Sequence, residues 1–498
     1  MNTSTVISIE NKGIGKFRAK GENLILKAVR LKTQTDNHDT LLEENTKYMY
    51  KGKIEETEGH IFILTDSYNN ISTVFIVPVP DCVMPIFRLI DSTVEIKAYG
   101  FPIYVGSCAP EDTDRFIRGW YRLLYKPKGL HAMSNTWGDR NGRSRVNDSF
   151  IRREIESGAD IGLDVVQIDD GWQKGIPDKY DENGLRVFEG DFWDVKKDIF
   201  PEGIQPLCGY AKEQGVELGL WFAPHSNGVF SKYERDIQVL KGAYDEWGIK
   251  YFKLDMIQLL SIEHSERMLD FLDDIFAFGD DVSVELDVTA DARLGYLLCA
   301  PYGTIFVENR YTAWSNYYPH RTLRNLWLLS RYIPASKFQF ELLNPELCAD
   351  KYSKDDPLRP ELYDIDYIFA SVMFSNPLFW METQFLSDKC RDKLKNIVHL
   401  WRMYRDEILN SDVYPIGEEP SGASMTGFVS DSDGIMHLLL FRENTNRESF
   451  TFDVGDSAEG EIELICSNSK IEFTQKENTV SVNFSNSASY AWFRIKKK

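Results

Sequence analysis

The stretch VVQIDDGWQKG, residues 165–175, begins as a buried strand would and then changes character. Its valines and isoleucine are β-branched residues, which favour strands. Two adjacent acids, Asp169 and Asp170, follow this run directly, before a glycine and Trp172. A hydrophobic run that ends in two negative charges indicates either a turn or a functional site at the tip of a strand. The surrounding sequence has to distinguish the two.

Further apolar runs alternate with amphipathic helical stretches through the middle of the chain. In order, the eight runs are AMSNTW (132–137), VVQIDD (165–170), VELGLWF (216–222), KYFKLDM (250–256), VSVELDV (282–288), GTIFVEN (303–309), KFQFELL (337–343) and PLFWMET (377–383). Strands that alternate with helices are joined by right-handed crossovers into a parallel sheet. Eight such units over about 280 residues predict an α/β fold with a closed (β/α)8 barrel. An open doubly wound sheet is the alternative.

The two ends of the chain show a different pattern, which is typical of β-strands without helices. Residues 1 to about 105 contain short β-rich runs divided by polar turns, as in HIFILTDSYNNISTVFIVPVP. In KENTVSVNF, Val480, Val482 and Phe484 alternate with polar residues, which is the period of a half-buried strand. The predicted domains are an N-terminal β-sandwich at 1–120, the barrel at 121–410 and a C-terminal all-β domain at 411–498.

The net charge restricts the classes of partner, and the cysteines indicate the redox environment. The chain has 57 basic and 77 acidic residues, a formal net charge of -20, which would repel nucleic acid and anionic membranes. Seven scattered cysteines without a CxxC pair favour reduced thiols. The sequence contains no stretch of about 18 apolar residues, so it predicts no membrane-spanning helix. We therefore expect a cytoplasmic protein, with a removed signal peptide as the alternative, and the sequence leaves a homo-oligomer open.

Nearly every predicted barrel strand ends in an acid or a tryptophan. These residues are Trp137, Asp169, Asp170, Trp221, Lys253 with Asp255, Glu285 with Asp287, Glu308, Glu341 and Glu382. In a (β/α)8 barrel the carboxyl ends of the strands form the face that carries active sites. One acid there would be explained as a helix cap, but such groups on seven strands predict a functional site.

The fourth and sixth runs suggest the chemistry. Lys253 and Asp255 are two residues apart and share one face of their strand, where the cation would favour an ionised carboxylate. Glu308 could face Asp255 across a bound molecule. Carboxylates about 5 Å apart would repel by about 3 kcal/mol, which leaves one nucleophile and one protonated acid near neutrality. The alternatives are a structural ion pair at Lys253, and pairing of Glu308 with Arg310 or Arg321.

Other sites are not indicated. GIGKF, at residues 13–17, lacks the third glycine of a dinucleotide-binding loop. KYDENG, at residues 179–184, has the wrong residue types at the first and last ligand positions of a calcium loop. The histidines are dispersed, and only His225 and His320 lie near strand ends. We expect neither a metal nor an organic cofactor.

Three segments together carry a family pattern. They are NTWGDRNGRSRVNDSFIRREIESGADIGLDVVQIDDGWQKG, GDFWDVKKDIFPEGIQPLCGYAKEQGVELGLWFAP and YFKLDM. This combination resembles the melibiase-type α-galactosidases of glycoside hydrolase family 36, closely over residues 130–260 and more weakly to about 400. The resemblance implies a retaining glycosidase that removes a terminal α-linked galactose, or a related sugar, through a glycosyl-enzyme intermediate. A carbohydrate is therefore the expected partner.

The resemblance also implies roles for single residues. In the family, paired acids after the second strand bind the hydroxyls of the terminal galactose, and they map onto Asp169 and Asp170, with Trp172 beside them. The Lys-x-Asp motif of the fourth strand maps onto Lys253 and Asp255. Asp255 is therefore the expected nucleophile, and Lys253 is expected to bind a ring hydroxyl.

The later motifs depart from the family. Glu308 occupies the place of the acid/base, where the family usually has Asp in a Ser-Asp-Asp type motif and this chain reads VENRY. Arg293 matches the arginine that follows the fifth strand, and Asp287 is an additional acid near the pocket. Trp137, Trp172 and Trp221 are expected to offer apolar walls to the sugar.

Three functional alternatives stay open. Plant raffinose-type synthases share this architecture, so the chain could transfer galactose rather than hydrolyse its linkage. The sugar could instead be N-acetylgalactosamine or β-L-arabinopyranose. A carbohydrate-binding barrel without catalysis is the third alternative, and the unusual motif at the sixth strand favours it.

Overall fold

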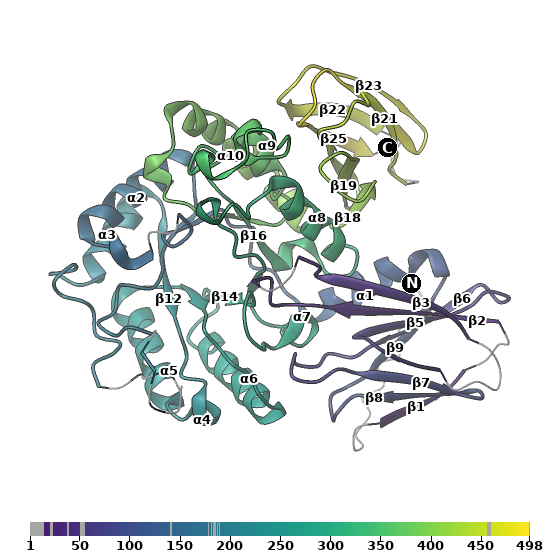
Figure 1. Cartoon of the computed structure of the whole chain (residues 1–498), viewed down its shortest axis with the longest axis horizontal. Helices are drawn as coiled ribbons and strands as arrows, with labels where there is room; N and C mark the ends of the chain where they lie inside the picture. The colour runs from purple at the N-terminus through teal and green to yellow at the C-terminus, as the bar shows by residue number, and fades with distance from the viewer. Residues whose placement is uncertain are drawn as a thin grey trace.

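The computed structural model has three regions that follow one another along the chain (Figure 1). A region of two β-sheets comes first, a barrel surrounded by helices follows, and a second all-β region comes last. The residues that the structure describes are 14–19, 23–36, 39–49, 55–139, 142–177, 179–180, 182, 186, 188, 190–455 and 460–497.

Eight parallel strands close into a barrel in the order of the chain. They are β10 (Met133–Asn135), β11 (Val165–Ile168), β12 (Glu217–Phe222), β13 (Tyr251–Leu254), β14 (Ser283–Asp287), β15 (Thr304–Phe306), β16 (Phe338–Leu342) and β17 (Asn376–Phe379). Pairing of Met133 with Leu378 joins the first strand to the last. Each strand overlaps the apolar run predicted for it, so the (β/α)8 barrel is confirmed and the open sheet is wrong.

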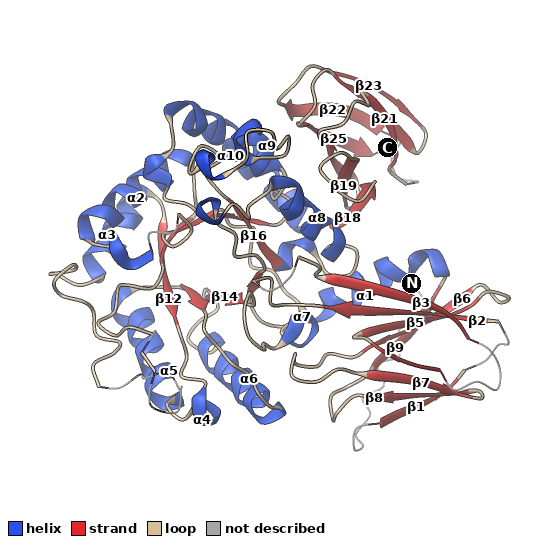
Figure 2. Cartoon of the chain, viewed as in Figure 1, coloured by secondary structure: helices blue, strands red, loops and turns tan. Residues whose placement is uncertain are grey.

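The helices lie on the outside of the barrel (Figure 2). They are α2 (Asp148–Ile161), α3 (Gln205–Gln214), α4 (Asn227–Phe230), α5 (Tyr233–Gly242), α6 (Ile262–Phe276), α7 (Gly295–Leu298), α8 (Pro319–Leu329), α9 (Ile365–Ala370) and α10 (Asp388–Leu409). Local sequence explains the limits of α2. The Asn147 side chain accepts a hydrogen bond from the Phe150 backbone at its start, and Gly162, with φ 95°, ends it in a conformation that favours glycine.

The N-terminal region is a sandwich of two antiparallel sheets. One sheet has the order β1 (Ile14–Arg18), β8 (Thr93–Lys97), β7 (Ile86–Ile90), β4 (Glu55–Glu58), and the other β3 (Leu42–Met49), β2 (Leu24–Leu31), β5 (Ile61–Asp66), β6 (Ile71–Ile76), β9 (Tyr104–Cys108). Leu26, Phe62 and Phe75 of one sheet share a buried core with Phe87 and Ile96 of the other. This core confirms the predicted sandwich.

The C-terminal region is also built of two antiparallel sheets. One has the order β18 (Asp412–Gly417), β19 (Met425–Asp431), β20 (Ile435–Arg442), β25 (Ser489–Lys497), β22 (Gly460–Ser467), and the other β21 (Ser449–Asp453), β24 (Thr479–Phe484), β23 (Ile471–Lys476). Val480, Val482 and Phe484 are buried while Ser481 and Asn483 are not, as the alternation predicted. The predicted all-β domain is therefore confirmed.

Helix α1 (Thr113–Leu124) connects the three regions. It follows the last strand of the sandwich and precedes the barrel. Its Arg118 guanidinium donates from Nε and Nη2 to the carboxylate of Asp412, at 2.9 Å each, where β18 begins. The predicted limit at 120/121 lies inside this helix, and the limit at 410/411 lies just before β18. Both limits stay predictions.

A segment of the sandwich also reaches the barrel. Between β2 and β3 the backbone N–H of Gln34 donates to the carbonyl of Val288 at 2.9 Å, and that of Asp36 donates to Thr289 at 3.0 Å. The Thr35 hydroxyl donates to the carbonyl of Val307 at 2.6 Å. We call residues 32–36 the β2–β3 segment. Its hydrogen bonds hold it against the chain that leaves β14 and β15 (Figure 1).

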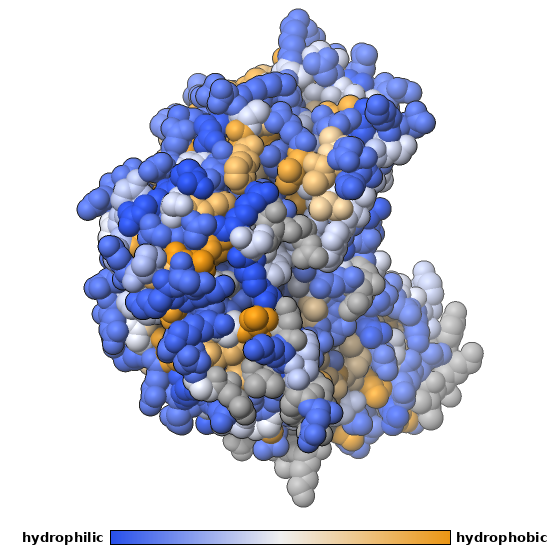
Figure 3. All heavy atoms as spheres, turned by 60° about the vertical axis from the view of Figure 1, so that its left-hand side comes forward, coloured by the Kyte–Doolittle hydropathy of each residue, from blue (hydrophilic) through white to orange (hydrophobic). Residues whose placement is uncertain are grey.

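The surface of the barrel side is mostly hydrophilic, and its apolar residues form small separate groups (Figure 3). Among the described residues, no helix has the length and apolar character that a membrane span requires. All seven cysteines are free.

Candidate active site

Charged side chains from the ends of β11, β13 and β14 meet at the carboxyl ends of the barrel strands, which we call the mouth. Lys253 of β13 places Nζ 3.0 Å from Oδ2 of Asp169 and 3.4 Å from Oδ2 of Asp287. It is only 4% exposed and lies 4.7 Å from the ring centroid of Trp380. Burial alone would lower the pKa of Lys253, but the charges of Asp169, Asp287 and Asp255 raise it above its ordinary value. Lys253 is therefore a fixed cation between acids.

Asp255 follows β13 directly and is the accessible carboxylate of this group. The Trp221 indole donates from Nε1 to its Oδ2 at 3.0 Å, and Arg293 Nη2 lies 4.0 Å from its Oδ1. Its side chain is 24% exposed, in contrast to the 4% of Arg293. Burial would raise the pKa of Asp255, but Lys253, the Trp221 hydrogen bond and Arg293 hold it below its ordinary value. This arrangement provides an ionised, oriented nucleophile.

Asp287 and Arg293 lie together beside Asp255. The backbone N–H and the hydroxyl of Thr289 donate to Oδ1 of Asp287 at 3.0 and 2.7 Å. Burial and the charge of Asp255 raise the pKa of Asp287 to about 6, although Lys253 and Arg293 oppose this shift. Arg293 donates from Nε to the Asp287 carbonyl, while its buried Nη1 has no partner among the described residues. A buried donor without a partner is costly, so a water or a ligand is needed to satisfy it.

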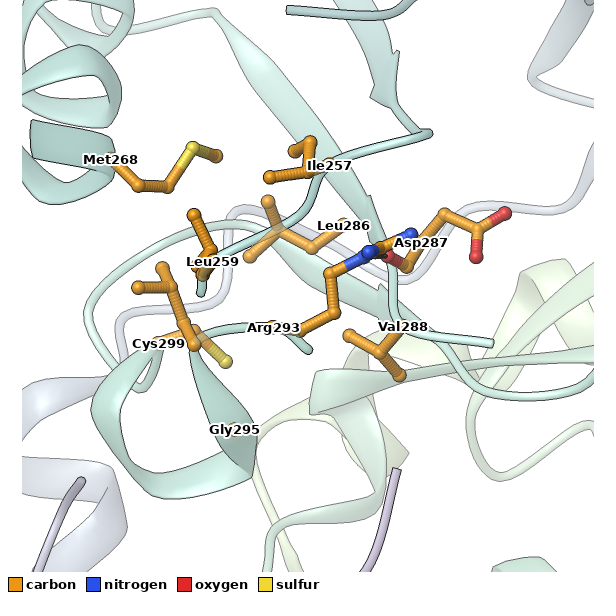
Figure 4. A pocket seen from close by; sticks show the side chains of 10 residues that line it. Ile257, Leu259, Met268, Leu286, Asp287, Val288, Arg293, Gly295 and Cys299 are labelled. Atoms are coloured by element: carbon orange, nitrogen blue, oxygen red, sulfur yellow. Dashed lines mark hydrogen bonds between the residues drawn. The ribbon is translucent and has the colours of Figure 1, made fainter. Parts of the chain in front are cut away.

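A small apolar pocket lies on the other side of this pair (Figure 4). Leu286 and Val288 of the β14 segment line it together with Leu259 and Met268. These aliphatic side chains keep water from the back of Arg293, which strengthens the charge interactions at the mouth.

The two acids after β11 have different partners. Asp169 accepts a hydrogen bond from Asn135 Nδ2 at 2.7 Å in addition to that from Lys253. Asp170 lies 3.0 Å from Arg143 Nη2 and accepts from Gln173 Nε2 at 2.6 Å. Both are buried at the mouth, where the structure brings Asp169 next to Lys253 and pairs Asp170 with the loop that follows β10.

The tryptophans separate into two groups. Trp137 is half-buried in the loop after β10, and Trp221 reaches Asp255. Trp172 has no exposed surface, because it stacks on Trp193 at 5.8 Å and donates its indole N–H to the Trp221 carbonyl. The prediction that Trp172 and Trp221 offer walls to the sugar therefore needs correction, because Trp221 is also only 1% exposed. The Trp172 ring packs behind the mouth and supports the strand that carries Trp221.

The prediction that Glu308 is the acid/base opposite Asp255 also needs correction. Both carboxylate oxygens face α8, where Thr322 donates to Oε2 at 2.7 Å and Asn325 Nδ2 donates to Oε1. The side chain is 1% exposed, and burial raises its pKa. Arg310, Asp39 and Glu341 are among the charges that act on it, whereas Lys253 and Arg293 act on Asp255. The structure thus does not bring Glu308 to the mouth as the partner of Asp255.

A first prediction tests this correction. The Glu308→Gln variant should keep kcat within about tenfold of the wild type, because the side chain would not touch the reacting atoms. It should unfold more easily, by about 1–3 kcal/mol, because the amide presents a donor where Thr322 or Asn325 also donates. Kinetic assays and urea unfolding measure the two effects. A fall in kcat of a thousandfold would restore Glu308 as the acid/base.

A polar layer lies one level below the mouth. Asn135 Nδ2 donates to Gln167 Oε1 at 2.7 Å, and Gln167 Nε2 donates to Glu285 Oε2 at 3.0 Å. Burial raises the pKa of Glu285 to about 8, although the Gln167 hydrogen bond opposes this shift. Near neutrality Glu285 is therefore a neutral acid.

This layer gives a second prediction. The folded protein holds a proton on Glu285 between the ordinary pKa and about 8, whereas the unfolded chain does not. The contribution of Glu285 to stability therefore falls as pH rises through this window, by up to about 1.4 kcal/mol per pH unit. The Glu285→Gln variant should lack this slope. Urea unfolding of both proteins at several pH values gives the difference, and identical slopes would contradict the prediction.

Three residues of the mouth have no counterpart in the sequence predictions. Asn135 and Trp380 hold Asp169 and Lys253, and Asp36 reaches the mouth from the sandwich. The strand-end rule signals Asn135 at the end of β10, whereas Asp36 has no such signal. Within the described residues, no group of three or more His, Cys, Asp or Glu side chains is arranged to hold a metal ion.

Comparison with known proteins places this site in a family. Residues 121–263 match the family model described as Melibiase. This segment belongs to the melibiase family. It includes β10 to β13 and therefore carries Asp169, Asp170, Lys253 and Asp255.

The relatives of the melibiase segment are bacterial α-galactosidases. "Alpha-galactosidase Mel36A" of Lactobacillus acidophilus is 33% identical over 111 residues, which cover 22% of this chain and 13% of that protein. "Alpha-galactosidase" of Escherichia coli is 33% identical over 110 residues, which cover 22% and 14%. The alignments thus span about one seventh of the length of these curated relatives.

Solved structures show the same fold around the melibiase segment. The GH36 α-galactosidase AgaA of Geobacillus stearothermophilus has a TM-score of 0.69 at 14% identity, over 97% of this chain and 76% of that chain. A variant of AgaA was solved in complex with raffinose. At this identity the likeness concerns the fold: a barrel between two all-β regions.

Proposed function

We propose that the chain is a retaining glycoside hydrolase that removes a terminal α-linked galactose or a closely related sugar. One observation carries the proposal: a partly exposed, ionised Asp255, fixed by Trp221, lies at the mouth of a barrel whose residues 121–263 match the melibiase model. The raffinose complex of AgaA supports an α-galactoside as the substrate. The whole activity stays a proposal because the curated relatives are matched over a small part of their length.

The proposed mechanism has two steps. Asp255 attacks the anomeric carbon and the bond to the leaving oxygen breaks as an acid donates a proton to it, which gives a glycosyl-enzyme. Water then attacks the same carbon and releases the sugar. We propose that Asp169, Asp170 and Lys253 bind ring hydroxyls, because their carboxylate and ammonium groups converge beside Asp255. Nη1 of Arg293 is a further donor for the sugar.

The proposal is tested with aryl glycosides. The wild type should cleave 4-nitrophenyl α-galactoside between about pH 4 and about pH 8 and release the α-anomer first, as NMR detects. Parallel assays with the α-N-acetylgalactosaminide and the β-L-arabinopyranoside identify the sugar, and added sucrose detects transfer. Absence of cleavage with all three aryl substrates would overturn the proposal.

A second function is favoured by one observation. Because Glu308 is buried against α8, the place that carries the acid/base in the family does not supply one here. A carbohydrate-binding barrel without turnover would have this property. Calorimetry that detects galactose binding by a wild type unable to cleave any aryl glycoside would establish it.

We also propose a cytoplasmic location, which the seven free thiols support. Cell fractionation tests it.

A further inference from the structure

The β2–β3 segment brings one acid of the sandwich to the mouth. Asp36 donates its backbone N–H to the carbonyl of Thr289, and Thr289 in turn holds Asp287 through two hydrogen bonds. The backbone of Asp36 is therefore held at the mouth by Thr289, whose own position is fixed by Asp287. The Gln34 side chain adds a hydrogen bond from Nε2 to the carbonyl of Asp291 at 2.9 Å.

The Asp36 side chain is oriented by residues that follow β15, whereas its backbone is held by the chain that follows β14. Asn309, which follows β15, donates from Nδ2 to Oδ1 of Asp36 at 3.0 Å. The side-chain oxygen Oδ1 of Asn309 accepts from the Tyr311 hydroxyl, which fixes the direction of the amide. The neighbouring Arg310 donates to Asp39. One oxygen of Asp36 is thus held by Asn309, and the side chain stays partly exposed to solvent.

The charges around Asp36 suit a proton donor. Partial burial raises its pKa, and the charge of Asp255 raises it further, while Asn309, Arg310 and Arg293 oppose the shift. Glu341, which accepts from the Arg310 backbone, is a further acid in this field. The net shift is upward, so Asp36 holds a proton to a higher pH than an ordinary aspartate. Asp255, by contrast, is shifted downward.

Other acids in this part of the barrel are paired with cations or buried. Asp169 and Asp287 share Lys253, and Asp170 pairs with Arg143. Glu308 and Glu341 are 1% and 0% exposed. Among the described residues, Asp36 combines exposure, a hydrogen bond that leaves one oxygen available, and an electrostatic interaction with Asp255.

We propose that Asp36, supplied by the N-terminal sandwich, is the general acid/base of this barrel. As Asp255 attacks the anomeric carbon, the Asp36 carboxyl gives its proton to the leaving oxygen, which departs as an alcohol. The Asp36 carboxylate then takes a proton from water, whose oxygen attacks the same carbon and displaces Asp255. Galactose leaves, and both carboxyl groups return to their starting forms. This inference rests on the proposed function.

The test compares leaving groups. In Asp36→Ala, cleavage of raffinose, which needs protonation of its leaving oxygen, should fall by about a hundredfold to ten-thousandfold. Formation of the glycosyl-enzyme from 2,4-dinitrophenyl α-galactoside should change much less, because this leaving group departs without a proton. Azide should then accelerate turnover and yield α-galactosyl azide, because the anion attacks without a base. Asp36→Asn, which preserves the shape, should lose the limb of the pH profile that reports the acid.

Matched variants complete the test. Glu43→Gln changes an exposed acid in β3, the strand that follows the β2–β3 segment. This variant should leave all rates unchanged. Asp291→Asn changes another acid near Arg293. If Asp36→Ala affects all leaving groups equally or yields no azide product, or if Asp291→Asn shows the expected pattern instead, the inference is wrong while the proposed function stands. A wild type that cleaves no glycoside overturns both.

Discussion

The Asp255→Asn variant is expected to lose at least about a thousandfold in kcat/KM for an aryl α-galactoside while it keeps its fold. The amide has the shape of the carboxylate and still accepts a hydrogen bond from Trp221, but it cannot form the glycosyl-enzyme. The initial rate of 4-nitrophenol release measures the loss, and thermal unfolding checks the fold.

The matched control is Asp245→Asn. This residue is exposed and pairs with Lys241 on the outside of the barrel, so the rate should not change. The variant at Asp255 should also lower the pKa of Asp287, because the charge of Asp255 raises that pKa in the wild type. Retention of kcat/KM within tenfold in Asp255→Asn would remove Asp255 from the mechanism.

The Lys253→Met variant should show the largest loss of stability, about 3–5 kcal/mol at neutral pH. Methionine fills a similar volume, but Asp169 and Asp287 would remain buried without their shared cation. Urea unfolding measures the loss. The control is Lys241→Met, which breaks an exposed pair and should cost less than about 1 kcal/mol.

The loss should depend on pH. Without Lys253 the pKa of Asp287, already raised to about 6, would rise further, so the folded variant binds protons that the unfolded chain releases. The stability of Lys253→Met should therefore recover as pH falls from about 7 to about 5. Equal stability of Lys253→Met and the wild type at pH 7 would show that the cation is not needed to hold these acids.

The sequence predicted the barrel and most of the mouth because both depend on local patterns. A buried parallel strand is predicted by its apolar run. Closure of the barrel then brings the residues at the ends of these runs to one face, irrespective of the conformation of the loops. Lys253 lies within β13, so the alternation of its strand fixes its direction. Val480 and Phe484 of the C-terminal region were predictable for the same reason.

The errors at Glu308 and Trp172 concern residues beyond the ends of strands. β15 ends at Phe306, so alternation no longer fixes the direction of Glu308, and α8 supplies the hydrogen bonds that turn it away from the mouth. Trp172 follows β11 after a glycine and turns inward to Trp193. Asp36 could not be predicted, because its place depends on a tertiary contact between the sandwich and the chain after β14.

The hydrogen bonds of the β2–β3 segment to Val288, Thr289 and Val307 have a consequence for how such proteins diversify. One border of the proposed substrate site belongs to a β-hairpin connection, which tolerates insertions and substitutions better than a barrel strand does. New specificities could therefore arise, in natural divergence or in a mutant library, from changes in the sandwich alone. A library confined to the barrel loops would leave that border unexplored.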